Sequence, residues 1–285
     1  MIIGAHLTIA KGMPAAVELT RSIDGNAFQF FTRNPRGGRA RHIGEAEIEE
    51  FRKLRQQEKI ECVVGHMPYT INLATNRPDI HEFGKETLLT DLERFAAAEV
   101  DFLVLHPGSH LGDGVDAGID RIVDALTFVF ERYHEQKPIL LLETMAGHGT
   151  EIGRNLQELR EIFRRLDWHE KMGICLDSCH LLAAGYDLTN TRGIDGFLEE
   201  VDTLLGLERM KMMHLNDSKQ GLGSQIDRHA RIGEGAFGME GVQAVVNHPV
   251  LGKLPFILES PVDKYQEYGD EIRKVRKVWK APMQR

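Results

Sequence analysis

Residues 102–110 read Phe-Leu-Val-Leu-His-Pro-Gly-Ser-His, four apolar residues that run directly into a histidine and a loop. A run this continuously apolar is typical of a strand buried on both faces, as in a parallel sheet covered by helices. Seven further runs have the same character. We predict eight strands, over residues 1–6, 27–31, 61–66, 101–106, 138–143, 172–177, 210–215 and 255–259.

Amphipathic, charge-rich segments separate these runs and indicate helices. Examples are Glu45 to Glu58, Phe83 to Ala98, Ile119 to Glu135, Asn155 to Leu166 and Gly196 to Leu205. No linker rich in Pro, Ser or Gly divides the chain. Eight strand-then-helix units favour a closed (β/α)8 barrel, the TIM barrel, over a doubly wound open sheet. We therefore expect an α/β protein with a single domain over residues 1–285.

Composition is that of an ordinary globular protein, with 42% hydrophobic and 27% charged residues. The three cysteines, Cys62, Cys175 and Cys179, are too few for a disulfide framework and indicate a reducing compartment. The apolar runs are far shorter than the roughly 20 residues of a membrane helix, and Met1-Ile2-Ile3-Gly4 lacks a signal-peptide pattern. We expect a cytoplasmic location and no membrane partner.

Six consecutive predicted strands end in a histidine or a carboxylate, and the following loops add three more. The active site of such a barrel lies at the carboxyl ends of its strands, so these side chains should share one rim. A single histidine at a strand end is more often a hydrogen-bonded structural group, but six adjacent strands with this ending favour metal binding. The nine candidates are His66, His106, Glu143, Asp177, His180, His214, Asp227, His229 and Glu259.

This donor set indicates a borderline metal. Zn²⁺ is the first choice and Mn²⁺ or Fe²⁺ are alternatives, since all-oxygen Mg²⁺ or Ca²⁺ sites would not use five imidazoles. We expect His6 and His110 to support the ligands rather than bind. The remaining histidines are interpreted as surface or packing residues: His42, His81, His134, His148, His169 and His248.

The net charge of −8 is unusual for a protein that binds nucleic acid, because backbone phosphates are normally met by a surplus of Lys and Arg. Three divalent cations would change this charge to −2 and place positive charge in the cleft. The global charge therefore does not exclude a nucleic-acid substrate.

The chain resembles the endonuclease IV family, the zinc-dependent apurinic/apyrimidinic endonucleases of base-excision repair. The resemblance spans nearly the whole chain and rests on nine ligands in family order together with local motifs. These motifs are Gly4-Ala5-His6, Phe31-Thr32-Arg33-Asn34, His106-Pro107-Gly108-Ser109-His110, Cys179-His180, Ala183-Ala184-Gly185-Tyr186-Asp187, His214-Leu215-Asn216-Asp217-Ser218-Lys219, Asp227-Arg228-His229 and Gly233-Glu234-Gly235.

The resemblance implies three zinc ions per chain. It assigns one to His66, His106 and Glu143, a second to Glu143, Asp177, His214 and Glu259, and a third to His180, Asp227 and His229. Glu259 and Glu143 would be catalytic, Glu259 by orienting or deprotonating the attacking water. The implied reaction is hydrolysis 5′ to an abasic site in duplex DNA, leaving a 3′-hydroxyl and a 5′-deoxyribose phosphate, by a monomer without a nucleotide cofactor. Cleaning of 3′ ends and incision at oxidised bases are further activities to expect.

The resemblance also implies DNA contacts. Arg36 and Tyr69 match positions that enter the duplex, and Gly37-Gly38 stands where the family carries a bulky aromatic, which predicts a smaller wedge. Without the family, Tyr69 reads as a half-buried loop aromatic and Arg36 as a solvated charge. The candidates for phosphate contact are Arg33, Lys219, Arg228 and Arg231.

Two alternative functions remain. A sugar isomerase or epimerase on the same fold would need one metal held by a set such as Glu143, Asp177, His214 and Glu259. The five surplus ligands would have no role in that enzyme. A zinc-stabilised DNA-binding module is the other alternative, although structural zinc sites are closed four-ligand cages, usually rich in cysteine.

Overall fold

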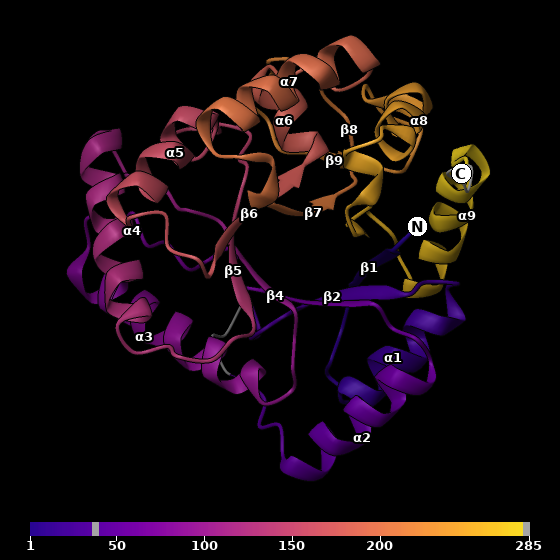
Figure 1. Ribbon diagram of the computed structural model, residues 1–285, viewed down its shortest axis with the longest axis horizontal. Coiled ribbons are helices and arrows are strands. Elements are labelled where there is room, and N and C mark those ends of the chain that lie inside the picture. Colours follow the sequence, from indigo (N-terminus) through magenta and orange to yellow (C-terminus); the bar gives the residue numbers. More distant parts are fainter. Residues whose placement is uncertain (36–39, 282–285) are drawn as a thin grey trace.

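Eight parallel strands form a closed barrel at the centre of the molecule (Figure 1), in a computed structural model that describes residues 1–35 and 40–281. Around the barrel the strands follow the order β1-β10-β7-β6-β5-β4-β3-β2. Every predicted strand is present, and the TIM barrel prediction is confirmed. The strands are β1 (Ile3–Leu7), β2 (Ala27–Phe31), β3 (Cys62–His66), β4 (Phe102–Leu105), β5 (Ile139–Glu143), β6 (Met172–Asp177), β7 (Met210–His214) and β10 (Phe256–Leu258).

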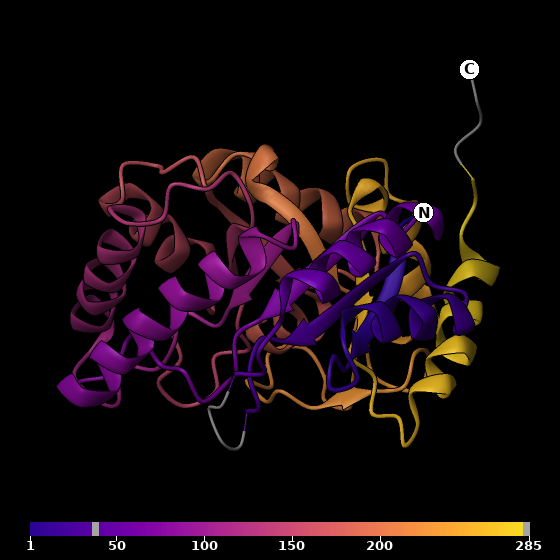
Figure 2. The same cartoon turned by 90° about the horizontal axis from the view of Figure 1, so that it is seen from below.

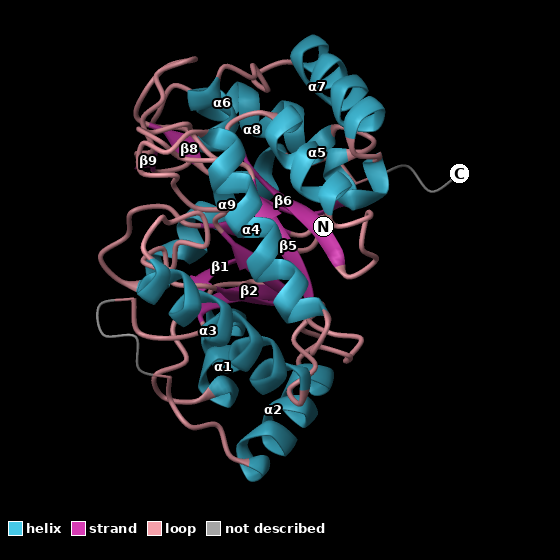
Figure 3. Cartoon of the chain, turned by 90° about the vertical axis from the view of Figure 1, so that its left-hand side faces the viewer, coloured by secondary structure: helices cyan, strands magenta, loops and turns pink. Residues whose placement is uncertain are grey.

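Helices surround the barrel and cover its outer face (Figures 1 and 3). The five expected helices are present with shifted ends; α3, for example, begins at Pro78, because proline is favoured in a first helical turn. The α-helices are α1 (Met13–Ser22), α2 (Glu45–Gln57), α3 (Pro78–Ala96), α4 (Val115–Phe130), α5 (Leu156–Arg165), α6 (Ser178–Ala184), α7 (Thr191–Leu204), α8 (Gly238–Asn247) and α9 (Tyr268–Val278). The 3₁₀ turns within the described residues are η1 (Leu207–Arg209), η2 (Leu251–Lys253) and η3 (Tyr265–Glu267). Among the described residues, no helix has the length and apolarity that crossing a membrane requires.

Strand alternation divides the apolar residues into two cores. A large core lies between strands and helices, and a small one, which includes Val64, Val104 and Leu141, fills the barrel interior. Successive side chains of a strand point to opposite faces, so the residue two positions after an interior residue also points inward. His66, His106 and Glu143 follow these three residues by two positions. The barrel therefore directs them to the interior at its carboxyl end.

A short antiparallel hairpin, β8 (Asp217–Ser218) and β9 (His229–Ala230), lies outside the barrel sheet. Ser218 pairs with His229 and Asp217 with Ala230. In Figure 2 the hairpin lies along the lower side of the molecule, together with loops that follow the strands. It carries the segment from Asp227 to His229 over the rim. The sequence patterns did not indicate this hairpin, because each strand is only two residues long.

Candidate metal centre

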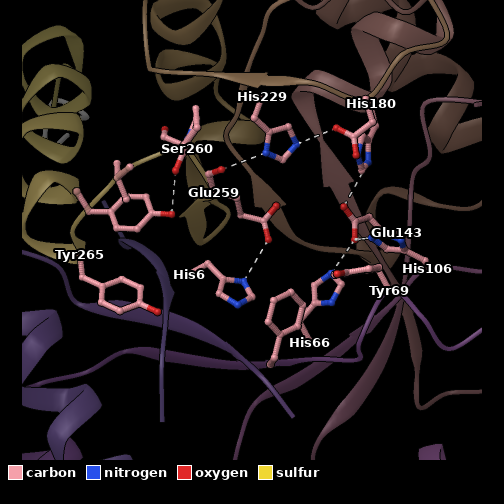
Figure 4. Close-up of a pocket in the computed structure, with 15 residues that line it drawn as sticks. His6, His66, Tyr69, His106, Glu143, His180, His229, Glu259, Ser260 and Tyr265 are labelled. Carbon is pink, nitrogen blue, oxygen red and sulfur yellow. Dashed lines mark hydrogen bonds and ion pairs between the residues drawn. The ribbon is translucent and has the colours of Figure 1, made fainter. Parts of the chain in front are cut away.

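The predicted ligands come together at the carboxyl end of the barrel (Figure 4). Four of them close strands, namely His66, Glu143, Asp177 and His214, while His106 and Glu259 follow β4 and β10 by one residue. His180 is placed by a helix cap. The Asp177 carboxylate accepts a hydrogen bond from the His180 backbone N–H at 2.8 Å, which starts α6 and explains the spacing of three residues.

Glu143 lies at the centre of the cluster and is 1% exposed. Its Oε2 lies 3.1 Å from His66 Nε2 and 3.2 Å from His106 Nε2. Its Oε1 lies 3.0 Å from His214 Nδ1 and 3.3 Å from His180 Nδ1. One carboxylate thus faces four imidazoles, two on each oxygen.

Ligand atoms lie within 4.8 Å of one another in each of the three groups that the resemblance implied. The first holds His66, His106 and Glu143, the second Glu143, Asp177, His214 and Glu259, and the third His180, Asp227 and His229. In the third group, Asp227 lies 3.3 Å from His180 Nε2 through one oxygen and 3.3 Å from His229 Nε2 through the other. The group is the most open of the three, because Asp227 is 44% exposed.

A buried carboxylate holds the loop that completes the third group. Asp217 is fully buried and accepts hydrogen bonds from five backbone N–H groups, those of Ser218, Gly233, Gly235, Phe237 and Gly238, at 2.7–3.2 Å. Its backbone pairs with Ala230 in the hairpin. Asp217 therefore fixes the chain on both sides of the Asp227 to His229 segment.

The imidazole hydrogen bonds fit a metal at these groups. Peptide oxygens can only accept, so the ring nitrogen beside one carries the proton. The Nδ1 atoms of His66, His180 and His229 donate in this way to the oxygens of Met67 (2.6 Å), Thr144 (2.9 Å) and Glu259 (3.1 Å). Each Nε2 then presents a lone pair toward carboxylates. The Nε2 atoms of His180 and His229 are buried and form no hydrogen bond with any described residue. A buried nitrogen without a hydrogen-bond donor is suited to bind a cation.

Charges within the cluster shift its pKa values. Burial raises the pKa of Glu143, but His214 and His106 hold it well below its ordinary range. Burial lowers the pKa of His180, yet the carboxylates of Asp177, Asp227 and Glu143 raise it well above the ordinary value. Without a metal, protons on the histidines would offset the negative charge. Metal binding must displace those protons.

A cavity of about 380 Å³ opens beside the cluster. Metal-group residues line this cavity together with the aromatic side chains of Phe31, Tyr69 and Tyr265. Tyr69 and Tyr265 are labelled in Figure 4. Tyr69 is 57% exposed and meets Phe31 edge to face. A ligand here would contact charged groups and aromatic rings together.

The predicted DNA contacts differ in their surroundings. Arg36 and the Gly37-Gly38 pair lie outside the described residues. Lys219 and Arg228 are exposed near the hairpin, whereas Arg231 is paired with Glu267. Arg33 is largely buried against Asp91. All remain predictions as DNA contacts.

Two polar residues that support the ligands were missed in the sequence. Gln29 is fully buried and contacts His6, His214 and Glu259. Asn216 Nδ2 donates to Asp177 at 2.7 Å and to Glu259 at 3.2 Å. Gln29 is the one polar residue of its strand, Ala-Phe-Gln-Phe-Phe, and that signal could have found it.

The other histidines are placed as follows. His6 Nδ1 lies 3.3 Å from Glu259 (Figure 4), which agrees with a supporting role. His110 instead accepts from the backbone N–H groups of Gly112 and Gly114, so it orders its own loop. The six histidines interpreted as surface or packing residues belong to none of the metal-binding groups formed by described residues.

The barrel and its rim of histidines and carboxylates define a metal-binding enzyme fold of known type. A family model described as xylose isomerase-like TIM barrel matches residues 17–281, and the chain belongs to that family. Structures of sugar epimerases share the barrel; a D-tagatose 3-epimerase-like protein superposes with a TM-score of 0.72 over 98% of both chains at 17% identity. A likeness at that identity concerns the fold alone.

Relatives of higher sequence identity show which branch of this family the chain belongs to. A protein named "Probable endonuclease 4" from Moorella thermoacetica is 46% identical over 278 residues, 98% of this chain and 99% of the relative. One of the same name from Clostridium beijerinckii is 43% identical over 97% and 98%. The structure of endonuclease IV from Thermus thermophilus superposes with a TM-score of 0.85 at 35% identity, covering 98% of each chain. The chain therefore belongs to the endonuclease IV family.

Proposed function

We propose that this protein is a DNA-repair endonuclease that hydrolyses the phosphodiester bond 5′ to abasic sites in duplex DNA, giving a 3′-hydroxyl and a 5′-deoxyribose phosphate. The observation that carries the proposal is the third ligand group, His180, Asp227 and His229. A one-metal sugar isomerase would need only a set such as Glu143, Asp177, His214 and Glu259. The named relatives support the same choice over the isomerase.

The three groups would hold three zinc ions, with Mn²⁺ or Fe²⁺ as substitutes. Imidazole and carboxylate donors suit these metals, and the hydrogen-bond pattern leaves lone pairs directed at the clusters. Bound there, the metals would act as Lewis acids on the phosphate oxygens and the departing 3′ oxygen.

Glu259 is suited to hold a proton from the attacking water. Its Oε1 accepts from Gln29 at 2.7 Å and lies beside His6, and its Oε2 accepts from Asn216 at 3.2 Å. Burial raises its pKa, but the charge of His214 keeps it well below the ordinary value, so the group is a carboxylate at neutral pH. It lines the cavity. A fixed carboxylate facing the cavity can orient a water and accept its proton.

The remaining parts of the proposal concern partners. Damaged duplex DNA would lie across the rim, with Tyr69 and Arg36 entering it and Arg33, Lys219, Arg228 and Arg231 near phosphates. Tyr69 is exposed enough to stack on a base. We further propose a cytoplasmic monomer in which residues 1–285 form one domain, acting without a nucleotide cofactor.

The test incubates zinc-loaded protein with a duplex carrying one abasic-site analogue, beside an undamaged duplex. A Glu259→Gln variant provides the matched control. Incision 5′ to the lesion only, lost in the variant, is the expected result. Absence of incision with Zn²⁺, Mn²⁺ and Fe²⁺ would contradict the proposal and direct attention to sugar substrates. Metal and DNA binding without incision would instead favour the binding module.

A further inference from the structure

Gln29 lies inside the barrel on β2, a strand that carries none of the nine predicted ligands. Its side chain is fully buried and reaches three groups of the cluster. The amide nitrogen lies 2.7 Å from Glu259 Oε1 and 3.0 Å from His6 Nδ1, and the amide oxygen lies 2.8 Å from His214 Nε2. All three of these side-chain contacts are with residues in or beside the cluster, which indicates that the amide acts on the cluster.

The orientation of this amide follows from its partners. The two hydrogens of Nε2 match two partners, a carboxylate oxygen and an imidazole nitrogen. The opposite orientation would put the amide oxygen 2.7 Å from a carboxylate oxygen, where both atoms can only accept. The amide oxygen therefore faces His214, and because it can only accept, His214 Nε2 carries a proton.

The proton on Nε2 leaves the other ring nitrogen of His214 with a free lone pair that points toward the cluster. This nitrogen, Nδ1, lies 3.0 Å from Glu143, 3.5 Å from Glu259 and 3.7 Å from Asp177. His66, His180 and His229 are held in one tautomer by peptide oxygens, which no substitution can remove. Among these four histidines, only His214 depends on a side chain for the same purpose.

We propose that Gln29 is a positioning residue: it holds the proton of His214 on Nε2, leaves Nδ1 free as the ligand atom of the second metal group, and orients Glu259 with its amide nitrogen. The inference rests on the proposed metal centre and concerns one of its three groups. Partners of this kind, which orient a ligand without touching the metal, change metal affinity by about 10-fold to 100-fold when they are removed.

Two substitutions separate hydrogen bonding from packing. Gln29→Met keeps the length of the side chain and removes the acceptor. Gln29→Glu keeps an acceptor for His214 while it loses the donor to Glu259. Zinc affinity is measured by competition with a chelator, and ¹⁵N shifts of the imidazoles in the zinc-loaded proteins show which ring nitrogen carries the proton. A His214→Asn variant assigns the His214 signals.

In the wild-type protein we expect three zinc ions and a His214 protonated on Nε2. Gln29→Met should weaken the binding of one of the three ions about 10-fold to 100-fold and leave the ion of the third group, whose ligands do not include Glu143, unchanged. Gln29→Glu should keep the Nε2 proton of His214. A His214 protonated on Nδ1 in the wild type would overturn the inference, and this result needs no variant to fold.

The remaining outcomes distinguish this inference from the proposed metal centre. If the wild type binds three zinc ions and Gln29→Met binds them equally well, Gln29 only fills space and the inference fails alone. If the wild type binds no metal, the metal centre itself fails, and the role of Gln29 fails with it.

Discussion

Arg33 is held by Asp91, whose two carboxylate oxygens accept from the arginine Nε at 3.0 and 2.9 Å. Asp91 is fully buried on α3 and also pairs with Arg94. The pair joins the loop after β2 to the outer helices. A residue predicted from its motif as a phosphate contact therefore has a structural partner too.

Removing Arg33 should cost stability. Arg33→Ala leaves the buried charge of Asp91 with Arg94 alone, and we expect a loss of about 3 kcal/mol in the free energy of unfolding. Urea denaturation measures it. The exposed Arg228→Ala serves as the control and should change stability by less than about 0.5 kcal/mol. Unchanged stability in Arg33→Ala, together with weaker DNA binding, would favour the phosphate contact instead.

Loss of Asp217 should open the third metal group. In Asp217→Ala the five backbone N–H groups lose their shared acceptor, so the segment with Asp227 and His229 loosens. We expect zinc content to fall from three to two per chain, measured by elemental mass spectrometry, with a loss of at least about 2 kcal/mol of stability. Asp263→Asn, an exposed carboxylate on another loop, should keep all three ions. Full zinc occupancy in Asp217→Ala would show that the loop holds its shape without the carboxylate.

Metal removal should reverse the pH dependence of stability. In metal-free protein the lowered pKa of Glu143 means that its carboxylate stabilises the folded state. This contribution is complete above the carboxyl pKa of the unfolded chain and is lost as pH falls through the pKa of the folded protein. The raised pKa of His180 means that its protonated imidazole also stabilises the folded state. This contribution is complete below the imidazole pKa of the unfolded chain and is lost as pH rises through the pKa of the folded protein. Both contributions are complete from about pH 4.5 to about pH 6.5.

Zinc competes with protons for the same atoms, so its stabilisation grows as pH rises. Thermal unfolding of chelated protein should therefore show falling stability above about pH 7, while zinc-loaded protein becomes more stable over the same range. Parallel pH profiles for the two forms would refute metal binding at the histidines.

Tyr69 should affect DNA and not the fold. Its ring is more than half exposed, so Tyr69→Ala should change stability by less than about 0.5 kcal/mol. Stacking on a base contributes about 1–3 kcal/mol, so affinity for abasic duplex should fall about 5-fold or more. Fluorescence anisotropy measures the affinity, and Tyr69→Phe, which keeps the ring, should bind nearly as well as the wild type. Equal affinity in the wild type, Tyr69→Ala and Tyr69→Phe would show that Tyr69 does not contact the DNA.

The strands and the ligand positions could be predicted because their signals are local. An apolar run ending in His66 or Glu143 is visible within six residues, and the barrel then brings such ends together. Gln29 could not be assigned a role in this way, since its partner Glu259 is 230 residues away and meets it only when β1 closes the barrel with β10. The pairing of Arg33 with Asp91 depends likewise on how α3 packs. These contacts follow from the closed barrel and not from any short motif.

Glu143 belongs to two of the metal groups at once, with a different oxygen turned to His66 and to His214. A cation that fixes one oxygen also restrains the other, so the second cation meets a carboxylate that has already lost its rotational freedom. Such linkage is reciprocal, and each occupancy raises the affinity of the other. The two groups that share Glu143 should therefore fill together over a narrow range of metal concentration, so that chains holding a cation in only one of these two groups are scarce.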